Sequence, residues 1–213
     1  MFAREAMIVK RQPADATDDT TSGARTQAQR RERTRGALIA AARVLFAERG
    51  YAAAGREEIV ERAGMTRGAM YHHFHSKEAL FQAVFEVVER ELCDAIATSA
   101  MASRDPIEQL RLGSRAFLEA AATGEVRRIV LLDAPAVLPV EVRRRLSEQY
   151  GLGMVREALR GVDAAGRLKV GPVDALALVM MAVLHEAATA IADGDDPGAM
   201  YSVIDGMITA ITV

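Results

Sequence analysis

The stretch from Gly50 to Lys77 constrains the fold more than any other part of this 213-residue sequence. Within it, EEIVERAGMTRGAMYHHFHSKEAL predicts two short helices joined by a glycine turn and followed by a third helix. Gly64 stands where a helix ends in the left-handed conformation, and Thr66 is a suitable N-cap for the next helix. Met70 and Phe74, four residues apart, share the inward face of that helix. The outward face has no carboxylate and therefore suits a polyanion.

Two helical segments flank this stretch in the sequence. RTRGALIAAARVLFAERG precedes the stretch and is amphipathic, and HSKEALFQAVFE continues it. The ordered set LFAERGY, EIVERAGMTRGAMYHHF and SKEALF resembles the DNA-binding domain of the TetR family of bacterial transcriptional regulators, over about residues 33–86. The resemblance implies an all-α protein of about nine helices. A three-helix DNA-binding domain, residues 25–76, with its helix-turn-helix at about residues 55–74, would precede a helical ligand-binding and dimerisation domain, residues 77–213.

The resemblance implies that residues 66–74 form a recognition helix in the major groove of operator DNA. The residues placed nearest the base edges are Arg67, Gly68, Ala69 and His72, and those placed at the DNA backbone are Thr66, Tyr71, His73 and Lys77. Arg67 ranks first for specificity, because Arg to guanine is the commonest bidentate base contact. For His73, capping or packing is the alternative role.

The sequence departs from the family pattern at the start of the first short helix. Gly55 stands where a Thr or Ser cap is usual, so that helix start lacks a side-chain acceptor. Arg56 replaces an aliphatic residue and becomes a candidate phosphate contact. Val60 stands where Ala is usual at the contact between the two helices.

The net charge of −2 requires any DNA binding to depend on local charge. Residues 25–35 hold five arginines against one glutamate, and four of these arginines form a candidate amino-terminal arm: Arg30, Arg31, Arg33 and Arg35. A solvated tail or first helical turn is the alternative interpretation of this run. Residues 1–24 are polar, contain Pro13 and have no sustained period, which predicts disorder rather than a signal peptide.

Beyond Glu86 the pattern stays helical. A long helix is predicted to about Met101, and further helices are predicted from Pro106 to Gly124, over residues 126–134 up to Pro135, over residues 139–160 with a bend at Gly151 and Gly153, over residues 173–192, and from Pro197. The helix over residues 173–192 is apolar nearly all round. His185 and Glu186 near its middle argue against a membrane span, so we expect burial on every side.

A second copy of the chain accounts for that burial. In the family the last two helices form a four-helix dimer interface, which here assigns Val179, Val183, Ile191, Val203, Ile204, Met207, Ile208 and Ile211 to a homodimer contact. A dimer also lets two recognition helices meet successive major grooves.

The family resemblance also implies a small hydrophobic effector bound in the second domain. The candidate pocket residues are Phe85, Phe117, Asp133, Tyr150, Met154, Met180 and His185. Ordinary core packing is the alternative for each apolar member. His185 and Asp133 would act as polar anchors if both face one cavity, and this idea fails if His185 pairs across the dimer contact.

We expect neither an enzyme nor a metal or other cofactor. His185-Glu186 begins like a zinc-protease motif, but Thr189 stands where the second ligand is needed. Cys93, the single cysteine, suits a cytoplasmic protein, and we interpret it as a small buried hydrophobe rather than a redox switch. The expected function is a repressor released from DNA by its effector. Two alternatives remain: a ligand-dependent activator, and a DNA-binding protein without effector that acts through protein partners.

Overall fold

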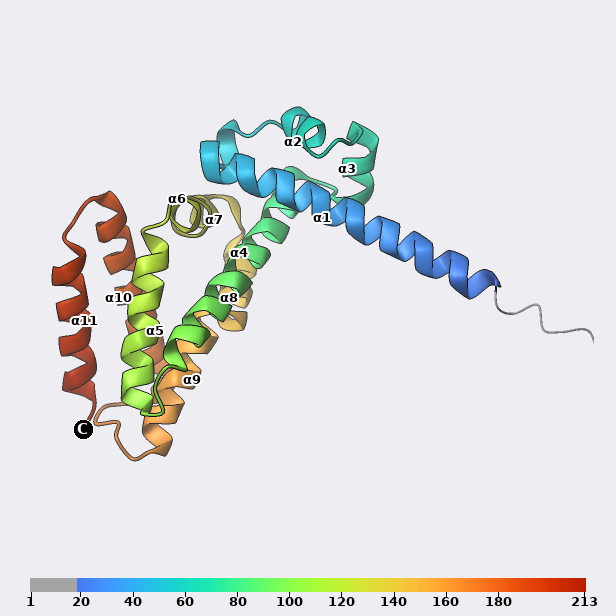
Figure 1. The fold of residues 1–213 in the computed structure, drawn as a ribbon. Helices are drawn as coiled ribbons and strands as arrows, with labels where there is room; N and C mark the ends of the chain where they lie inside the picture. Colours follow the sequence, from blue (N-terminus) through green and yellow to red (C-terminus); the bar gives the residue numbers. More distant parts are fainter. Residues whose placement is uncertain (1–18) are drawn as a thin grey trace, which may run out of the picture. The chain divides into compact units, whose positions relative to one another are not determined.

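The structure is a computed structural model that describes residues 19–213, with side chains from residue 27 onward. Within that range every regular element is helical, apart from one isolated antiparallel bridge between Leu168 and Thr212, so the predicted all-α class is confirmed (Figure 1). The elements in chain order are α1 (Asp19–Ala53), α2 (Arg56–Arg62), α3 (Arg67–His73), α4 (Lys77–Ala100), α5 (Pro106–Ala121), α6 (Gly124–Val126), the π-helix η1 (Arg127–Asp133), α7 (Ala134–Val137), α8 (Val140–Gln149), α9 (Gly151–Ala164), α10 (Val173–Asp193) and α11 (Pro197–Ile211).

The chain divides into two compact units, residues 1–36 and residues 37–213. The expected boundary between residues 76 and 77 falls inside the second unit, because one continuous core joins α1–α3 to the later helices through α4. Of the segment predicted to be disordered, residues 1–18 lie outside the described residues. Residues 19–24 begin α1 instead, and their Asp, Thr and Ser residues are favoured at helix starts.

Aromatic rings connect the end of α1 to the start of α4. The ring of Phe46 lies 5.3 Å from that of Phe81 in an edge-on arrangement, and Tyr51 lies 5.7 Å from Phe46 and 5.2 Å from Phe81. Phe46 and Phe81 are fully buried. Such edge-on pairs add about 0.5–1.5 kcal/mol each beyond the burial of apolar area. The position of α4 relative to the end of α1 is therefore well determined by packing.

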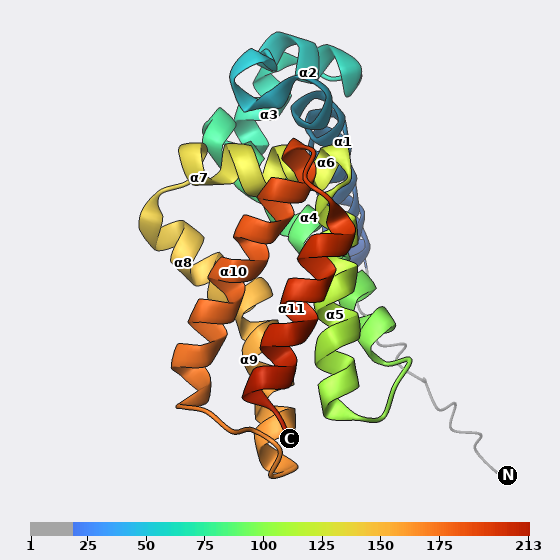
Figure 2. The same cartoon turned by 90° about the vertical axis from the view of Figure 1, so that its left-hand side faces the viewer.

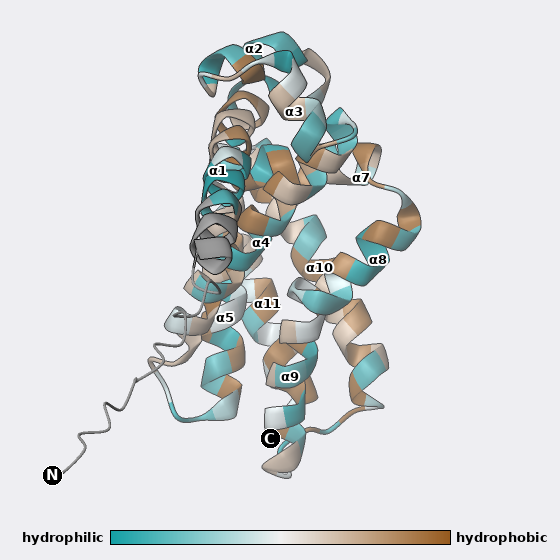
Figure 3. Cartoon of the chain, turned by 90° about the vertical axis from the view of Figure 1, so that its right-hand side faces the viewer, coloured by the Kyte–Doolittle hydropathy of each residue, from teal (hydrophilic) through white to brown (hydrophobic). Residues whose placement is uncertain are grey.

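The carboxy-terminal helices pack around α5. Helix α4 lies along one side of α5, and α10 contacts both α5 and α9, while α11 contacts α5 and α10. Figure 2 shows α10 and α11 side by side. Hydrophilic (teal) and hydrophobic (brown) residues alternate along α8 and α9 in Figure 3, as expected of helices that bury one face. The predicted helix starts at Pro106, Val173 and Pro197 are confirmed.

Two predicted segments differ from the structure. Residues 126–134 were expected to end at Pro135, but η1 continues directly into α7, because a proline is tolerated in the first turn of a helix. The expected helix over residues 139–160 is two helices. They meet at Tyr150, whose backbone (φ −118°, ψ −105°) is not helical. A side chain at Gly153 would overlap the carbonyl oxygen of Glu148, so this junction needs a glycine there.

Candidate functional site

The helix-turn-helix forms from local signals that the sequence carries. Gly64 ends α2 in the left-handed conformation (φ +67°), as predicted. Thr66 caps α3, where its Oγ1 accepts a hydrogen bond from the backbone N–H of Ala69 at 3.3 Å. Gly55 precedes α2 without any side-chain cap, as predicted. The turn and the cap together fix the direction in which α3 leaves α2.

One face of this pair is buried and the other is open. Ile59, Val60, Met70 and Phe74 are buried, as their spacing predicts. The exposed members of the predicted DNA-contacting set are Arg56, Thr66, Arg67, Gly68, Tyr71 and His72, and Ala69 and His73 are half-buried. The arrangement leaves a surface of hydroxyl, imidazole, phenol and guanidinium groups from α2 and α3.

Two of these side chains have partners that the sequence did not indicate. Arg67 is ion-paired with Glu57 on α2, and both side chains are exposed. Arg56 donates a hydrogen bond from Nη1 to the hydroxyl oxygen of Tyr71 at 3.0 Å. An exposed ion pair contributes about 0–1 kcal/mol, so Arg67 can exchange Glu57 for another partner at little cost.

Lys77 is half-buried at the start of α4. Its Nζ lies 4.3 Å from the centre of the Tyr51 ring, and burial, followed by the nearby charge of Arg56, lowers the pKa of its ammonium. The Tyr51 hydroxyl in turn donates to Glu78 at 2.7 Å. Lys77 therefore belongs to the contact between α1 and α4 in this structure, and a phosphate would have to compete with the aromatic ring for its charge.

The four arginines of the candidate arm lie on α1, not on an extended segment. Arg30, Arg31 and Arg33 are exposed, and Arg35 is half-buried. The Thr34 hydroxyl donates to the carbonyl of Arg30 at 2.9 Å, one helical turn earlier. Helical geometry spreads these guanidinium groups around the helix, whereas an extended arm would place them in one line.

The end of α1 is joined to η1 by polar contacts across 82 residues of sequence; we call this set the η1–α1 contact. Asp133 accepts a hydrogen bond from the backbone N–H of Tyr51 at 2.6 Å, and Arg128 lies 3.4 Å from the same carboxylate. Arg43 donates to Glu125, which lies just before η1, through Nε and Nη2, at 2.7 Å each. The hydrogen bond to Glu125 is the largest cause of the raised pKa of the Arg43 guanidinium.

Two cavities lie among the carboxy-terminal helices. The α5 cavity, of about 330 Å³, has mostly apolar walls from α4, α5, α9 and α10. The α8 cavity, of about 670 Å³, is lined by residues of α4, η1, α7, α8, α9 and α10. The two share Gly151 and Met181 as lining residues, so they are neighbours.

The predicted pocket residues divide between these cavities and other places. Phe117 and Met154 line the α5 cavity, and Phe85 and His185 line the α8 cavity. Met180 is buried in the core, and Tyr150 packs against the core at the α8–α9 junction. Asp133 belongs to the η1–α1 contact, so the idea that Asp133 and His185 anchor one ligand is wrong. Sequence reasoning missed Glu89, which lines the α8 cavity.

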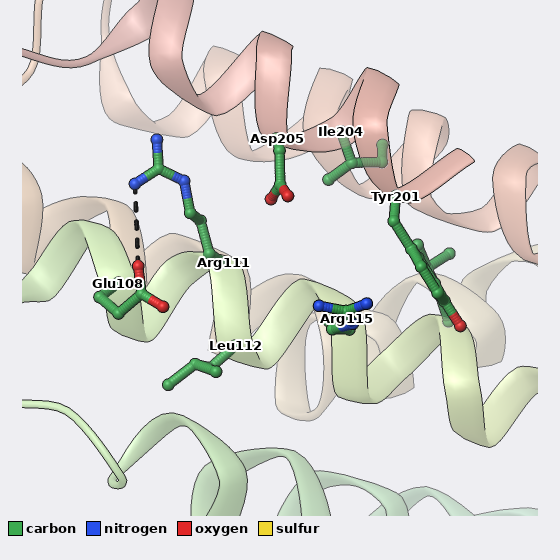
Figure 4. Close-up of a pocket in the computed structure, with 8 residues that line it drawn as sticks. Glu108, Arg111, Leu112, Arg115, Tyr201, Ile204 and Asp205 are labelled. Carbon is green, nitrogen blue, oxygen red and sulfur yellow. Dashed lines mark ion pairs between the residues drawn. The ribbon is translucent and has the colours of Figure 1, made fainter. Parts of the chain in front are cut away.

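A third hollow, the α11 groove, lies between α5 and α11 and measures only about 70 Å³ (Figure 4). Its walls are charged, with Glu108, Arg111, Arg115 and Asp205 among them. The Arg115 guanidinium lies over the Tyr201 ring at 4.7 Å. Volume and polarity make this groove a poor match for a hydrophobic ligand.

Helices α10 and α11 leave an apolar face uncovered. Leu178, Val179 and Val203 are 57%, 57% and 58% exposed. Exposed small residues, Ala175, Ala182, Gly206 and Ala210, continue these two stripes at helical spacing. Three predicted interface residues are corrected: Ile191, Ile204 and Ile208 are buried within the chain itself, while Val183, Met207 and Ile211 are partly buried against the core.

Within the described range, α10 is the one helix long and apolar enough to cross a membrane on length and composition alone. A core helix of a soluble protein passes the same test, so this is weak evidence for a membrane span. In the same range no three His, Cys, Asp or Glu side chains gather as a metal site would require. Cys93 is half-buried, and burial raises the pKa of its thiol to about 12, which disfavours a reactive thiolate.

Comparison with known proteins agrees with this geometry. Residues 38–84 match the family model for bacterial regulatory proteins of the tetR family, and residues 107–211 match the model for a tetracyclin repressor-like C-terminal domain. A TetR-family transcriptional regulator from Pectobacterium atrosepticum has 32% sequence identity and a TM-score of 0.69, over 85% of this chain and 93% of that one.

Curated relatives match over shorter segments. The HTH-type transcriptional activator FasR of Mycolicibacterium smegmatis is 36% identical over 89 residues, which are 42% of this chain and 41% of FasR. The HTH-type transcriptional regulator AcrR of Shigella flexneri is 33% identical over 109 residues, 51% of each protein. In these matches the chain spans about half the length of its curated relatives, or less.

Proposed function

Because the chain belongs to the TetR family of DNA-binding transcriptional regulators, we propose that it is a repressor released from its operator by a small hydrophobic effector. The observation that carries the proposal is the double role of η1. Val130 of η1 lines the α8 cavity, while Asp133 of the same helix accepts a hydrogen bond from the Tyr51 N–H and Arg128 donates one to the carbonyl of Arg49 at 3.5 Å, both near the end of α1. A ligand that moves η1 would therefore act on the DNA-binding helices.

In the proposed DNA complex, α3 enters the major groove. Arg67 leaves Glu57 for a guanine edge, Gly68 and Ala69 permit close approach, and His72 reads a neighbouring base. Arg56, Thr66, Tyr71 and His73 contact phosphates, and Lys77 joins them if the phosphate displaces the Tyr51 ring. The helical run from Arg30 to Arg35 supplies further, sequence-independent attraction to phosphates.

The functional unit in this proposal is a homodimer built on the uncovered face of α10 and α11. Leu178, Val179 and Val203 meet their counterparts across a two-fold axis, and the small residues beside them allow the helices to approach closely. Two recognition helices then reach half-sites about 34 Å apart, one helical turn of DNA. We place this dimer in the cytoplasm, where operator DNA and a reduced Cys93 are both expected.

The test is DNA captured from sheared genomic DNA by the purified chain, then titrated with three variants. Arg67→Ala is expected to relax sequence preference by about 1–3 kcal/mol at one position of each half-site. Lys77→Ala is expected to weaken binding to all sequences and to reduce the salt dependence. Arg160→Ala, far from α3 in sequence and exposed on α9, is the control. Unchanged binding by both Arg67→Ala and Lys77→Ala would contradict the docking.

Activation is the second candidate, because the relative FasR is named a transcriptional activator. A promoter fusion in a strain lacking the gene separates the two: a repressor raises expression when deleted, and an activator lowers it. The alternative without an effector is less favoured, since cavities of about 330 and 670 Å³ would be filled by side chains in a protein that binds no ligand there.

A further inference from the structure

Glu89 is an uncompensated carboxylate in the wall of the α8 cavity. Its side chain is only 8% exposed, and α4 places it among the buried residues Phe85, Val88 and Leu92. Within residues 27–213 no group donates a hydrogen bond to Glu89, and no cation lies within ion-pair distance of it. Burying an ionised carboxylate without a partner costs several kcal/mol, so the protein carries this cost for some purpose other than stability.

The neighbours of Glu89 do not neutralise it. Burial alone raises its pKa to about 7, and its charge in turn contributes to the raised pKa of the Cys93 thiol and the Tyr150 hydroxyl. His185 lines the same cavity, but burial lowers the pKa of its imidazole, which favours the neutral ring. The remaining acidic residue of the wall, Glu148, already pairs with Arg156 at 2.6 Å. Glu89 is thus the unpaired carboxyl group of this cavity, and it is mainly ionised above about pH 7.

Two arginines also line this cavity, and the Nε of Arg143 is buried without a hydrogen-bond partner. Arg143 and Arg144 lie on α8, where Arg144 is exposed and Arg143 half-buried. An anionic ligand held by these two guanidinium groups would leave Glu89 buried and unpaired, and would add a second negative charge to the same cavity. A cationic ligand group at Glu89 removes that unpaired charge, and charge-assisted hydrogen bonds are about twice as strong as neutral ones.

The apolar part of such a ligand can occupy the neighbouring α5 cavity. Gly151 has no side chain, and a Cβ there would lie 2.9 Å from the Cε atom of Met181. Met181 therefore stands at the boundary between the α8 and α5 cavities, and methionine side chains rearrange easily. Beyond it, the α5 cavity offers Ile96, Phe117, Val155 and Leu184 as apolar walls.

We propose that the effector is an elongated apolar amine whose ammonium group binds Glu89 in the α8 cavity and whose apolar body extends past Met181 into the α5 cavity. The inference rests on the proposed function in one respect, namely that this domain takes an effector. It adds the chemical class of that effector and the residue that selects it. The ligand class is defined by the unpaired carboxylate at one end and the apolar cavity at the other.

Three probes with one apolar body and three head groups test the selection: 4-phenylbutylamine, 4-phenylbutan-1-ol and 4-phenylbutyrate. Calorimetric titration of the full chain without DNA is expected to rank them amine, alcohol, carboxylate, with about tenfold or more between the first and the last. In Glu89→Gln the amine should lose that advantage, while Glu86→Gln, on the same helix but outside both cavity walls, should preserve it. Ala97→Phe, which fills the α5 cavity, should weaken all three probes and keep their order.

The proposal is overturned if the carboxylate binds as tightly as the amine, if the ranking survives Glu89→Gln, or if no probe binds at about 1 mM. Circular dichroism of each variant separates lost binding from lost folding, and Glu89→Gln removes a buried charge and should fold. Operator release is measured separately. If the amine binds through Glu89 and DNA stays bound, the proposed effector-released repression fails and the ligand class stands. If the carboxylate releases DNA instead, the proposed effector-released repression stands and the ligand class fails.

Discussion

At the scale of single residues, Glu89 should make the stability of the protein depend on pH. Its pKa is about 7 in the folded chain against an ordinary value of 4.5, so the folded state binds the proton more tightly. The resulting stabilisation is fully present below pH 4.5 and is lost as the pH rises through about 7. A shift of this size corresponds to about 3 kcal/mol.

Glu89→Gln should therefore be more stable than the wild type by up to about 3 kcal/mol at about pH 8, and by little at about pH 4.5. His185 acts in the opposite direction, since its lowered pKa destabilises the folded state as the pH falls below 6.5. That contribution is present in both proteins and cancels in the difference. Urea unfolding of both proteins across this pH range is the measurement. A difference that does not change with pH would show that the pKa of Glu89 is the same in the folded and unfolded states.

Gly50 is the second residue with a measurable consequence. Its backbone (φ +79°, ψ 164°) lies in a region that is essentially restricted to glycine, and a Cβ there would overlap the Arg128 guanidinium. Gly50→Ala should cost more than the strain alone, about 2–4 kcal/mol in unfolding free energy, because Arg128 must also leave its place. Gly64→Ala is the matched control, since Gly64 also has a positive φ but open space around it, and its cost should stay near 1 kcal/mol.

Single residues whose role depends on local chemistry could be predicted from the sequence. Met70 and Phe74 were assigned to the buried face from spacing alone, because helical period relates residues four apart. Thr66 and Gly64 were assigned from local backbone chemistry. The prediction for Asp133 as a ligand anchor was wrong, and the prediction for Arg67 lacked its ion-pair partner. The partners, Tyr51 and Glu57, come from other elements, and no local pattern reveals that Asp133 binds a residue 82 positions away. Glu89 gave no signal, because a glutamate in a helix is ordinary until its burial is known.

At the scale of elements, η1 links the α8 cavity to the end of α1 through Val130 and Asp133. Asp133→Ala removes the acceptor for the Tyr51 N–H and the carboxylate near Arg128. If η1 transmits the effector's action, the variant should still bind operator DNA, while the ratio of operator affinities without and with effector should fall by about tenfold. The measurement is fluorescence anisotropy of labelled operator at several effector concentrations.

Asp193→Ala is the control for this element. It breaks the ion pair between Arg127 of η1 and Asp193, which lies at the end of α10 and not on α1. The affinity ratio should remain near that of the wild type, since exposed pairs contribute little. An equal loss of response in both variants would mean that η1 matters through general stability rather than through its contact with α1.

Element boundaries were the least predictable feature of the fold. The helix starts at Pro106, Val173 and Pro197 follow from prolines that favour the first turn of a helix. The π-helix at residues 127–133 has no such signal, because no residue type in the sequence marks its wider turn. The break at Tyr150 was anticipated only as a bend at the neighbouring glycines, and tertiary packing decides its sharpness.

At the scale of the whole molecule, the uncovered face of α10 and α11 should determine the oligomeric state. A monomer would expose Leu178, Val179 and Val203 together, and apolar patches of this kind mark interaction surfaces. Leu178→Glu would place a charge at the proposed two-fold contact, where it would face its own copy. The variant should therefore sediment as a monomer, and Val170→Glu, at another exposed apolar residue outside both helices, should not.

Operator binding links this surface to function. A monomeric Leu178→Glu carries one recognition helix, so it loses the second half-site and the gain from joining two binding events. Its affinity for a full operator should fall by about 100-fold or more, while its affinity for an isolated half-site should match the wild type. Sedimentation velocity and anisotropy on the two DNA lengths give both quantities. A monomer that binds the full operator as tightly as the wild type would contradict the two-fold arrangement, because one recognition helix would then supply all of the binding energy.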